Sequence, residues 1–384
     1  MFSSRTNWDL TANRLSEAQA KHRASGRPLL DLTVSNPTEC GFAHEAKILA
    51  PLANPAALAY TPEPRGLEIA RRAVSDYYAA RNDSVAPNDI FLTTSTSEAY
   101  SYIFRLLCNP ADEIMIPAPS YPLFDYLAEL QDVKLVRYPL LYDHGWQIDF
   151  HELERAITAR TRAIIVVNPN NPTGQFCKPA EIARLNQICT GTPLAIIADE
   201  VFLDFALNGE QVAGFAANSP ALTFTLSGIS KICGLPQMKS AWLAVSGPAD
   251  LQRIAIDRLE VIADTFLSMN APVQLALSSL LESRHEFQAR LMARERANLA
   301  ALDEQLAAQT TCSRLEFEGG WYAVLRVPAL RSDEDLAIEL LSTRDVYVHP
   351  GHFFDFPDDG FLVVSLLPPE SEFFEALSRL LSFF

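Results

Sequence analysis

Short apolar runs alternate with longer amphipathic stretches between about Ala86 and Val245. Six hydrophobic runs flanked by polar or turn-forming residues predict buried β-strands over residues 89–95, 112–119, 134–140, 162–169, 194–202 and 222–228. Hydrophobic residues at helical spacing predict helices over residues 97–108 and 179–191. Strands that alternate with helices in this way indicate an α/β fold, with a mostly parallel sheet sandwiched by helices.

The pattern changes toward both ends of the chain. After about Leu275 it predicts a long charged helix, a strand, a second helix and a further segment, at residues 280–309, 321–328, 333–343 and 345–354. We therefore expect a large domain of residues 46–275. A smaller α+β domain would use both ends of the chain, residues 1–45 plus 276–384.

Composition narrows the possible classes of protein. With 384 residues, the chain is long for a single hydrophobic core. A formal net charge of −16 argues against nucleic acid or an anionic membrane as a partner, because such partners bind clustered lysine and arginine. No apolar run approaches the roughly 20 residues needed to span a bilayer, and the N-terminal residues lack a signal-peptide core, so we expect a cytoplasmic protein.

The six cysteines are scattered without Cys-x-x-Cys pairs or nearby histidines. This spacing favours free thiols over a disulfide framework or a zinc site, and we expect no bound metal.

Polar residues gather where the predicted strands end, which is where ligands bind in sheets of this kind. These residues are Ser95, Thr96, Ser97, Asn171, Asp199, Ser230 and Lys231. Each also has a structural explanation on its own, as a helix cap, a turn residue or a solvated charge. Their convergence at one sheet edge favours a shared binding site.

The chemistry of these groups is complementary. A helix start rich in serine and threonine suits a phosphate group. A desolvated lysine has a lowered pKa and becomes a nucleophilic amine that forms Schiff bases, and an aspartate can hold a ring nitrogen protonated. Phosphate, aldehyde and ring nitrogen together describe pyridoxal 5′-phosphate.

Three motifs carry a family resemblance: NPNNPTG at residues 168–174, DEVF at residues 199–202 and SGISKICGLP at residues 227–236. In order and approximate spacing they resemble the class I/II aminotransferases of the aspartate aminotransferase superfamily, which are pyridoxal-phosphate enzymes of fold type I. The resemblance runs from about Leu30 to the C-terminus. It implies a sheet of the seven-stranded type in the large domain.

The resemblance also implies roles for individual residues. Lys231 would form the Schiff base with the cofactor and later move protons between the substrate and the cofactor. Asp199 would pair with the pyridine nitrogen, Asn171 would bind the ring's 3-oxygen, and Tyr121 would stack on the ring. The phosphate group would be held by Thr96, Ser97, Ser230 and Lys239. Tyr60 would reach the phosphate of a neighbouring subunit, so a homodimer with shared active sites is implied.

Four positions depart from the family pattern. Phe202 replaces a tyrosine that donates to the 3-oxygen, which should raise the pKa of the Schiff base. Lys239 stands where arginine is common, and Ser95 stands where glycine is common. Val363, in GFLVVSLLPP, stands where an arginine usually clamps the substrate's α-carboxylate.

Losing that arginine leaves two explanations open. Either other groups hold the carboxylate, or the substrate has no carboxylate there. Candidate substitutes are His352, Arg326 and His349. Ser35, where the family often has a glycine facing the substrate, is a further candidate for the substrate side.

The resemblance implies an enzyme, an aminotransferase that moves an amino group from an amino acid or amine to a 2-oxo acid. A pyridoxal-phosphate lyase or decarboxylase on the same scaffold is the alternative, because Val363 weakens the case for an ordinary transaminase. A regulatory protein without turnover is disfavoured because Lys231, Asp199 and Asn171 are all present. A nicotinamide dehydrogenase is disfavoured because the chain has no GxGxxG turn.

Overall fold

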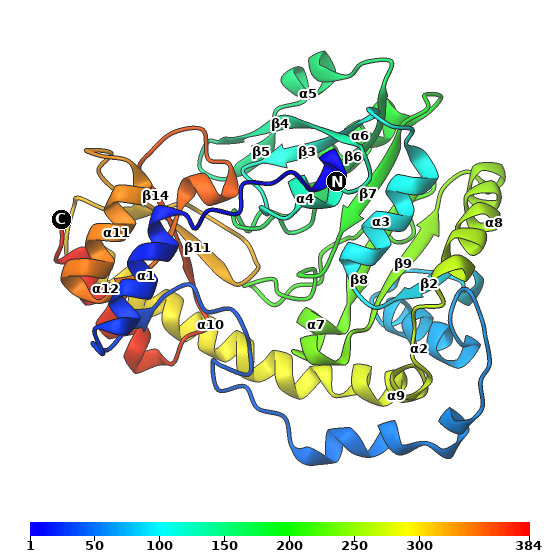
Figure 1. The fold of residues 1–384 in the computed structure, drawn as a ribbon, viewed down its shortest axis with the longest axis horizontal. Helices are drawn as coiled ribbons and strands as arrows, with labels where there is room; N and C mark the ends of the chain where they lie inside the picture. The colour runs from blue at the N-terminus through cyan, green and yellow to red at the C-terminus, as the bar shows by residue number, and fades with distance from the viewer.

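Eight strands form the central sheet of the protein, seen here in a computed structural model that describes all residues, 1–384 (Figure 1). Their order in space is β2 (Ile90–Thr93), β9 (Ala241–Ser246), β8 (Thr223–Gly228), β7 (Ala195–Asp199), β6 (Thr161–Val167), β3 (Glu113–Ala118), β4 (Lys134–Tyr142) and β5 (Trp146–Ile148). β9 runs antiparallel to both of its neighbours and β5 runs antiparallel to β4, whereas every other pair is parallel. The mostly parallel sheet is therefore confirmed, with β5 as a short additional edge strand.

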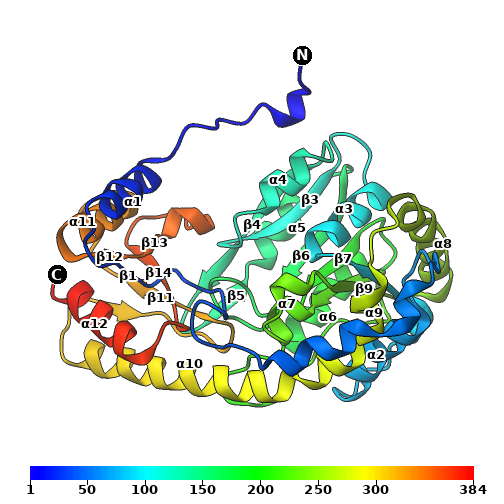
Figure 2. The same ribbon diagram turned by 60° about the horizontal axis from the view of Figure 1, so that its bottom comes forward.

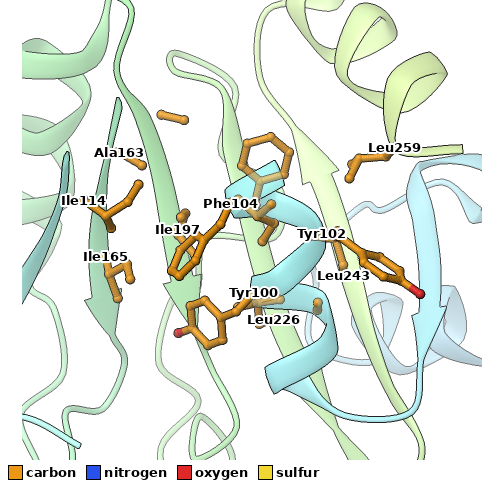
Figure 3. Close-up of a cluster of buried hydrophobic side chains, with 14 of the residues drawn as sticks. Tyr100, Tyr102, Phe104, Ile114, Ala163, Ile165, Ile197, Leu226, Leu243 and Leu259 are labelled. Carbon is orange, nitrogen blue, oxygen red and sulfur yellow. The ribbon is translucent and has the colours of Figure 1, made fainter. Parts of the chain in front are cut away.

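Helices cover both faces of this sheet. One face carries α3 (Thr96–Leu107), α4 (Phe124–Glu129) and α8 (Ala249–Phe266). Figure 3 shows the aromatic side chains of α3 packed against Ile197, Leu226 and Leu243 of the sheet. The opposite face carries α5 (Phe150–Ala156) and α6 (Pro179–Cys189) at one end, and α2 (Glu68–Ala79), α7 (Ile229–Ile232) and α9 (Ala271–Glu282) at the other.

A smaller lobe contains an antiparallel sheet in the order β10 (Ser313–Arg314), β11 (Tyr322–Arg326), β14 (Phe361–Ser365) and β13 (His349–Pro350). A separate parallel pair, β1 (Leu30–Asp31) and β12 (Val346–Tyr347), joins the two ends of the chain. The helices of this lobe are α1 (Arg14–Ala24), α11 (Asp333–Arg344) and α12 (Glu370–Leu381). Leu15 and Leu32 share a hydrophobic cluster with residues 302–380, so this core draws on both ends of the chain.

The longest helix, α10 (Arg284–Ala307), runs along the base of both lobes (Figure 2). The single predicted helix over residues 280–309 is wrong at its start, because residues 280–282 belong to α9. At the junction, the hydroxyl of Ser283 donates to the carbonyl oxygen of Leu280 at 2.6 Å, a back-bond that competes with the helical hydrogen bonds.

The two lobes also share buried contacts. Val324, Phe354 and Val363 from the small lobe belong to the same hydrophobic cluster as Tyr138 and Trp146 from the large sheet. The small-lobe sheet is thereby held against the large lobe. None of the helices is both long enough and apolar enough to cross a membrane.

Candidate active site

A cavity of about 280 Å³ lies where strands β6, β7 and β8 end. Its walls contain most of the site residues that the sequence predicts, namely Ser35, Thr96, Ser97, Tyr121, Asn171, Asp199, Phe202, Ser230 and Lys231. These residues are separated by as many as 196 positions in the chain, from Ser35 to Lys231, yet they line one space. The fold therefore brings the predicted chemistry together.

Lys231 lies on the single turn of α7, directly after β8. Its Nζ atom lies 4.7 Å from the centre of the Trp321 ring and 5.3 Å from that of Phe202, within the range of cation–π contacts. Burial lowers the pKa of Lys231 to about 8, and the charge of Asp199 opposes this shift. A substantial fraction of Lys231 is therefore an uncharged, nucleophilic amine at mildly alkaline pH.

Gly228 allows the lysine turn to form this close to the sheet. A Cβ atom at position 228 would lie 2.9 Å from the Cβ of Ala241 on β9. Any larger residue would push β8 and β9 apart just before Lys231.

Asp199 is the last residue of β7, and two groups fix its carboxylate. The Tyr100 hydroxyl donates to Oδ2 at 2.9 Å, and the Val201 backbone N–H donates to Oδ1 at 3.3 Å. Burial raises the pKa of Asp199 to about 6, while these hydrogen bonds and the charge of Lys231 limit the rise. Asp199 is mostly ionised at neutral pH and can hold a proton on a neighbouring ring nitrogen.

Asn171 lies in the turn between β6 and α6. The side chains of the two nearby asparagines form hydrogen bonds within the protein: Asn168 donates to Glu200 at 3.1 Å, and Asn170 donates to Thr173 at 2.9 Å. The side-chain oxygen of Asn171 is buried at the cavity without a partner. Its amide is therefore available to a bound molecule.

Hydroxyl groups from two helices line the cavity. Thr96 and Ser97 are the first two residues of α3, and Ser230 lies on the α7 turn. Ser95 does not line the cavity, because its hydroxyl accepts from the Glu98 N–H at 3.1 Å as the N-cap of α3. The N-terminus of α3 and these hydroxyls suit an anionic group such as a phosphate.

Three other predicted residues lie outside the cavity walls. Lys239 is exposed in a left-handed backbone conformation with a φ of 50°. Tyr60 is 80% exposed on the large lobe, and His352 is exposed with its ring against Phe353. Within one chain, the structure does not bring these side chains into the site.

The position of the missing arginine is filled by packing. Val363 is completely buried in the cluster between the lobes, and it brings no charge to this position. Arg326 lies at the far end of β11 with its guanidinium over the rings of Tyr142 and Phe361. His349 is partly buried, which lowers its pKa, and it does not line the cavity either.

Sequence reasoning missed three aromatic residues of the site. Tyr100 orients Asp199, Trp321 contacts Lys231, and Tyr322 lines the cavity. Tyr100 lies four residues after Thr96 on the same helix, but that spacing is equally typical of a core residue. For Trp321 and Tyr322, the preceding Gly-Gly pair is the signal of a close turn that could have drawn attention to them.

Comparison with known proteins identifies the family. The family model described as aminotransferase class I and II matches residues 29–380. The chain belongs to the class I and II aminotransferases. It is 28% identical over 372 residues to the glutamate-pyruvate aminotransferase of Haemophilus influenzae, covering 93% of this chain and 91% of that protein.

Other aminotransferases agree with this assignment. The alanine aminotransferase of Mycobacterium bovis is 28% identical over 382 residues, which cover 95% of this chain and 87% of that protein. The crystal structure of an aminotransferase from Escherichia coli matches with a TM-score of 0.86 at 26% identity, covering 100% of this chain and 98% of that one. An alanine aminotransferase from Pyrococcus furiosus shares the fold, with a TM-score of 0.89 at 22% identity over 100% of this chain and 99% of that one.

This chain is therefore an aminotransferase, and the cofactor of this family is pyridoxal phosphate. The cavity fits that cofactor in its donor set, which combines one amine, one carboxylate and several hydroxyls. The side-chain oxygen of Asn171 is buried without a partner and can accept a hydrogen bond from a ligand, whereas the Nδ2 group of the same amide is the donor that a ring oxygen needs. Lys231, Asp199 and Asn171 thus offer an amine, a carboxylate and an amide to one cavity.

Proposed function

We propose that this aminotransferase moves an amino group between an amino acid or amine and a 2-oxo acid, with Lys231 as its reactive amine. The observation that carries the proposal is the placement of the Lys231 amine in one cavity with Asp199 and Asn171. Bound pyridoxal phosphate supplies an aldehyde and an electron-withdrawing ring. The names of the relatives support transamination over the lyase or decarboxylase alternative.

The residues divide the chemistry among them. Lys231 would hold the cofactor through its aldehyde and, as a free amine, would take up and return the proton at the substrate's Cα. Asp199, held by Tyr100, keeps a proton on the pyridine nitrogen. Asn171 would donate to the ring oxygen, and Tyr121 would pack against the ring.

The phosphate group belongs at the start of α3. Thr96, Ser97 and Ser230 would provide hydroxyls there, and the exposed side chain of Lys239 would supply a positive charge by turning toward them. Ser95 contributes through the helix start that it caps. Phe202 has no hydroxyl and cannot donate to the ring oxygen. Of the two positions 171 and 202, only Asn171 would therefore provide a side-chain donor.

We also propose a homodimer with shared active sites. Large apolar side chains are exposed around a groove of about 700 Å³ that contains Tyr60, including Leu58 at 92% and Leu267 at 59% exposure. Such a patch is typical of a protein interface. The interface would carry Tyr60 of one subunit to the phosphate of the other.

Two further proposals come from the sequence. A cytoplasmic location is supported by six free cysteines, five of them buried, which is typical of a reducing compartment. A division into a large domain, 46–275, and a small domain, 1–45 plus 276–384, is supported by the hydrophobic cluster that both chain ends share.

Two half-reactions test the proposed function. With purified enzyme and added cofactor, an L-amino acid from a panel should bleach the visible band of the lysine-bound cofactor, and a 2-oxo acid should restore it. Steady-state rates should give the parallel lines of a ping-pong mechanism, and Lys231→Ala should abolish turnover. Release of ammonia or CO₂ without a need for the 2-oxo acid would contradict the proposal.

A further inference from the structure

Charge is scarce in the active-site cavity. Among the residues that line it, only Asp199 and Lys231 have side chains that carry a charge near neutral pH. Under the proposed function, Lys231 is engaged in the chemistry and Asp199 repels anions. The cavity walls of this chain therefore offer no free cation for the carboxylate of an amino acid or a 2-oxo acid.

Uncharged donors are present on the small-lobe side of the same cavity. Tyr322 and Ser35 both line it, one from β11 and the other from the segment after β1. Burial raises the pKa of Tyr322 to about 12, and the nearby Ser35 hydroxyl offsets part of that rise. The phenol therefore keeps its proton at neutral pH and acts as a donor.

The sheet register places Tyr322 beside the position where the arginine is missing. Tyr322 pairs with Ser365, and Val324 pairs with Val363 on the same two strands. Because side chains two residues apart share a face of a sheet, Tyr322 and Val363 are diagonal neighbours on one face. Val363 is buried in the interlobe cluster, whereas Tyr322 reaches the cavity.

We propose that the hydroxyls of Tyr322 and Ser35 hydrogen-bond the carboxylate of the substrate, which makes Tyr322 a specificity-determining residue. The inference rests on the proposed function and names how the same site binds an amino acid or a 2-oxo acid. A phenol that donates to a carboxylate forms a charge-assisted hydrogen bond, stronger than one between neutral groups. Recognition by neutral donors also avoids placing a second cation beside Lys231, which would lower its pKa further.

The test separates the carboxylate from the amine. The holoenzyme is assayed with L-alanine and with ethylamine, which lacks only the carboxylate, and with the corresponding pair for the best L-amino acid of a panel. Propionate, a carboxylate without an amine, is titrated by calorimetry, so that binding is measured without turnover. Tyr322→Phe removes one hydroxyl and keeps the ring, and Ser35→Ala removes the other.

Tyr322→Phe should raise the KM for the amino acid and the Kd for propionate about 10- to 100-fold, the range expected for one hydrogen bond to a charged group. The value of kcat should change little, and kcat/KM for ethylamine should stay the same. Ser35→Ala should act in the same direction with a smaller effect.

Arg294 provides a matched control. Its guanidinium donates to the carbonyl oxygen of Leu367 at 3.2 Å and lies over the Phe42 ring, outside the cavity walls. Arg294→Gln should leave both the KM and the Kd for propionate unchanged. If this variant weakens propionate binding and Tyr322→Phe does not, Arg294 holds the carboxylate and the inference is overturned.

Two other results would overturn the inference. One is an equal loss for ethylamine and the amino acid in Tyr322→Phe, because the tyrosine would then not act on the carboxylate. The other is a wild-type enzyme that does not bind propionate and prefers ethylamine. Failure of the proposed function is a separate result, since no donor would then be transaminated, while the propionate titration would still decide the role of Tyr322.

Discussion

At the residue scale, Asp199 depends on a neighbour that the motifs do not reveal. The Tyr100 hydroxyl donates to its Oδ2 at 2.9 Å, and the Tyr100 ring packs edge-on against Phe124 at 5.4 Å between centroids. The hydrogen bond stabilises the ionised carboxylate and so lowers the pKa that burial raises. Tyr100 is thus a positioning residue for the carboxylate that, under the proposed function, would face the cofactor's ring nitrogen.

Tyr100→Phe should raise the pKa of Asp199 above its value of about 6 by about one unit, because the ionised carboxylate loses a donor. As the pH is lowered, Asp199 should become protonated earlier in the variant, so the affinity for pyridoxal phosphate should begin to decrease at a higher pH than in the wild type. Measuring the Kd of the cofactor from pH 5 to pH 8 checks this. The control is Tyr102→Phe on the same helix, whose hydroxyl lies 3.2 Å from Ser268 instead. Equal shifts in both variants would refute the positioning role.

The sequence predicted the residues with distinctive chemistry better than those that support them. Lys231, Asp199 and Asn171 stand in motifs, and the structure places all three at one cavity. Tyr100 was missed because a buried aromatic on a helix looks the same whether it fills the core or binds a carboxylate. His352 was nominated by its place in the chain, but the path of its backbone leaves it exposed.

At the scale of elements, two loops distant in sequence are joined. Gly174 has a φ of +67°, and its carbonyl oxygen accepts from the N–H groups of Glu318 and Gly319 at 3.0 Å each. A Cβ at Gly174 would lie 2.5 Å from the carbonyl oxygen of Gly319. The turn that carries Asn171 is therefore fixed to the loop that carries Trp321.

Gly174→Ala should destabilise the protein by about 3 kcal/mol, because left-handed strain adds to a clash with backbone. Gly191→Ala is the matched control, since Gly191 has a φ of +74° and open space around it. That variant should lose only about 1 kcal/mol. Denaturant unfolding of both proteins measures the difference. Equal losses would show that the contact between the loops contributes nothing.

The apolar pattern predicted β2, β3, β6, β7 and β8 because nearly all of their residues are buried. It also predicted β4, which is partly exposed. It missed β5, whose three residues are too few for a pattern, and β9, although residues 241–245 are all apolar. The predicted start of the long helix failed at Ser283, where a local hydrogen bond interrupts an otherwise continuous helical pattern. The spacing of hydrophobic residues gives little indication of where a side chain will compete with the backbone for a helical hydrogen bond.

At the scale of the whole molecule, Tyr60 and Lys239 are exposed in the single chain. The proposed dimer, with a site completed by a second subunit, would account for the exposed Tyr60. The surrounding apolar groove would favour association, because its burial would remove Leu58 and Leu267 from water.

Mixed dimers test this assembly. Lys231→Ala and Tyr60→Ala variants should each have low activity, and co-refolding them should restore about one quarter of wild-type sites. Half of the dimers would then be mixed, and each would have one intact site of two. Activity assays and size-exclusion chromatography of the mixture provide the measurement. If the mixture is no more active than its parents, Tyr60 does not act across the interface.

The covalent attachment of pyridoxal phosphate to the cofactor-free protein tests the central claim most directly. Its rate should be measured from pH 6 to pH 10, with borohydride reduction and peptide mapping to locate the modified residue. Burial lowers the pKa of Lys231 to about 8, so the uncharged amine, and with it the rate, should increase with pH around a midpoint near 8. The account predicts the label on the peptide that contains Lys231. A label on other lysines, or a midpoint near the ordinary lysine pKa of about 10.4, would contradict it.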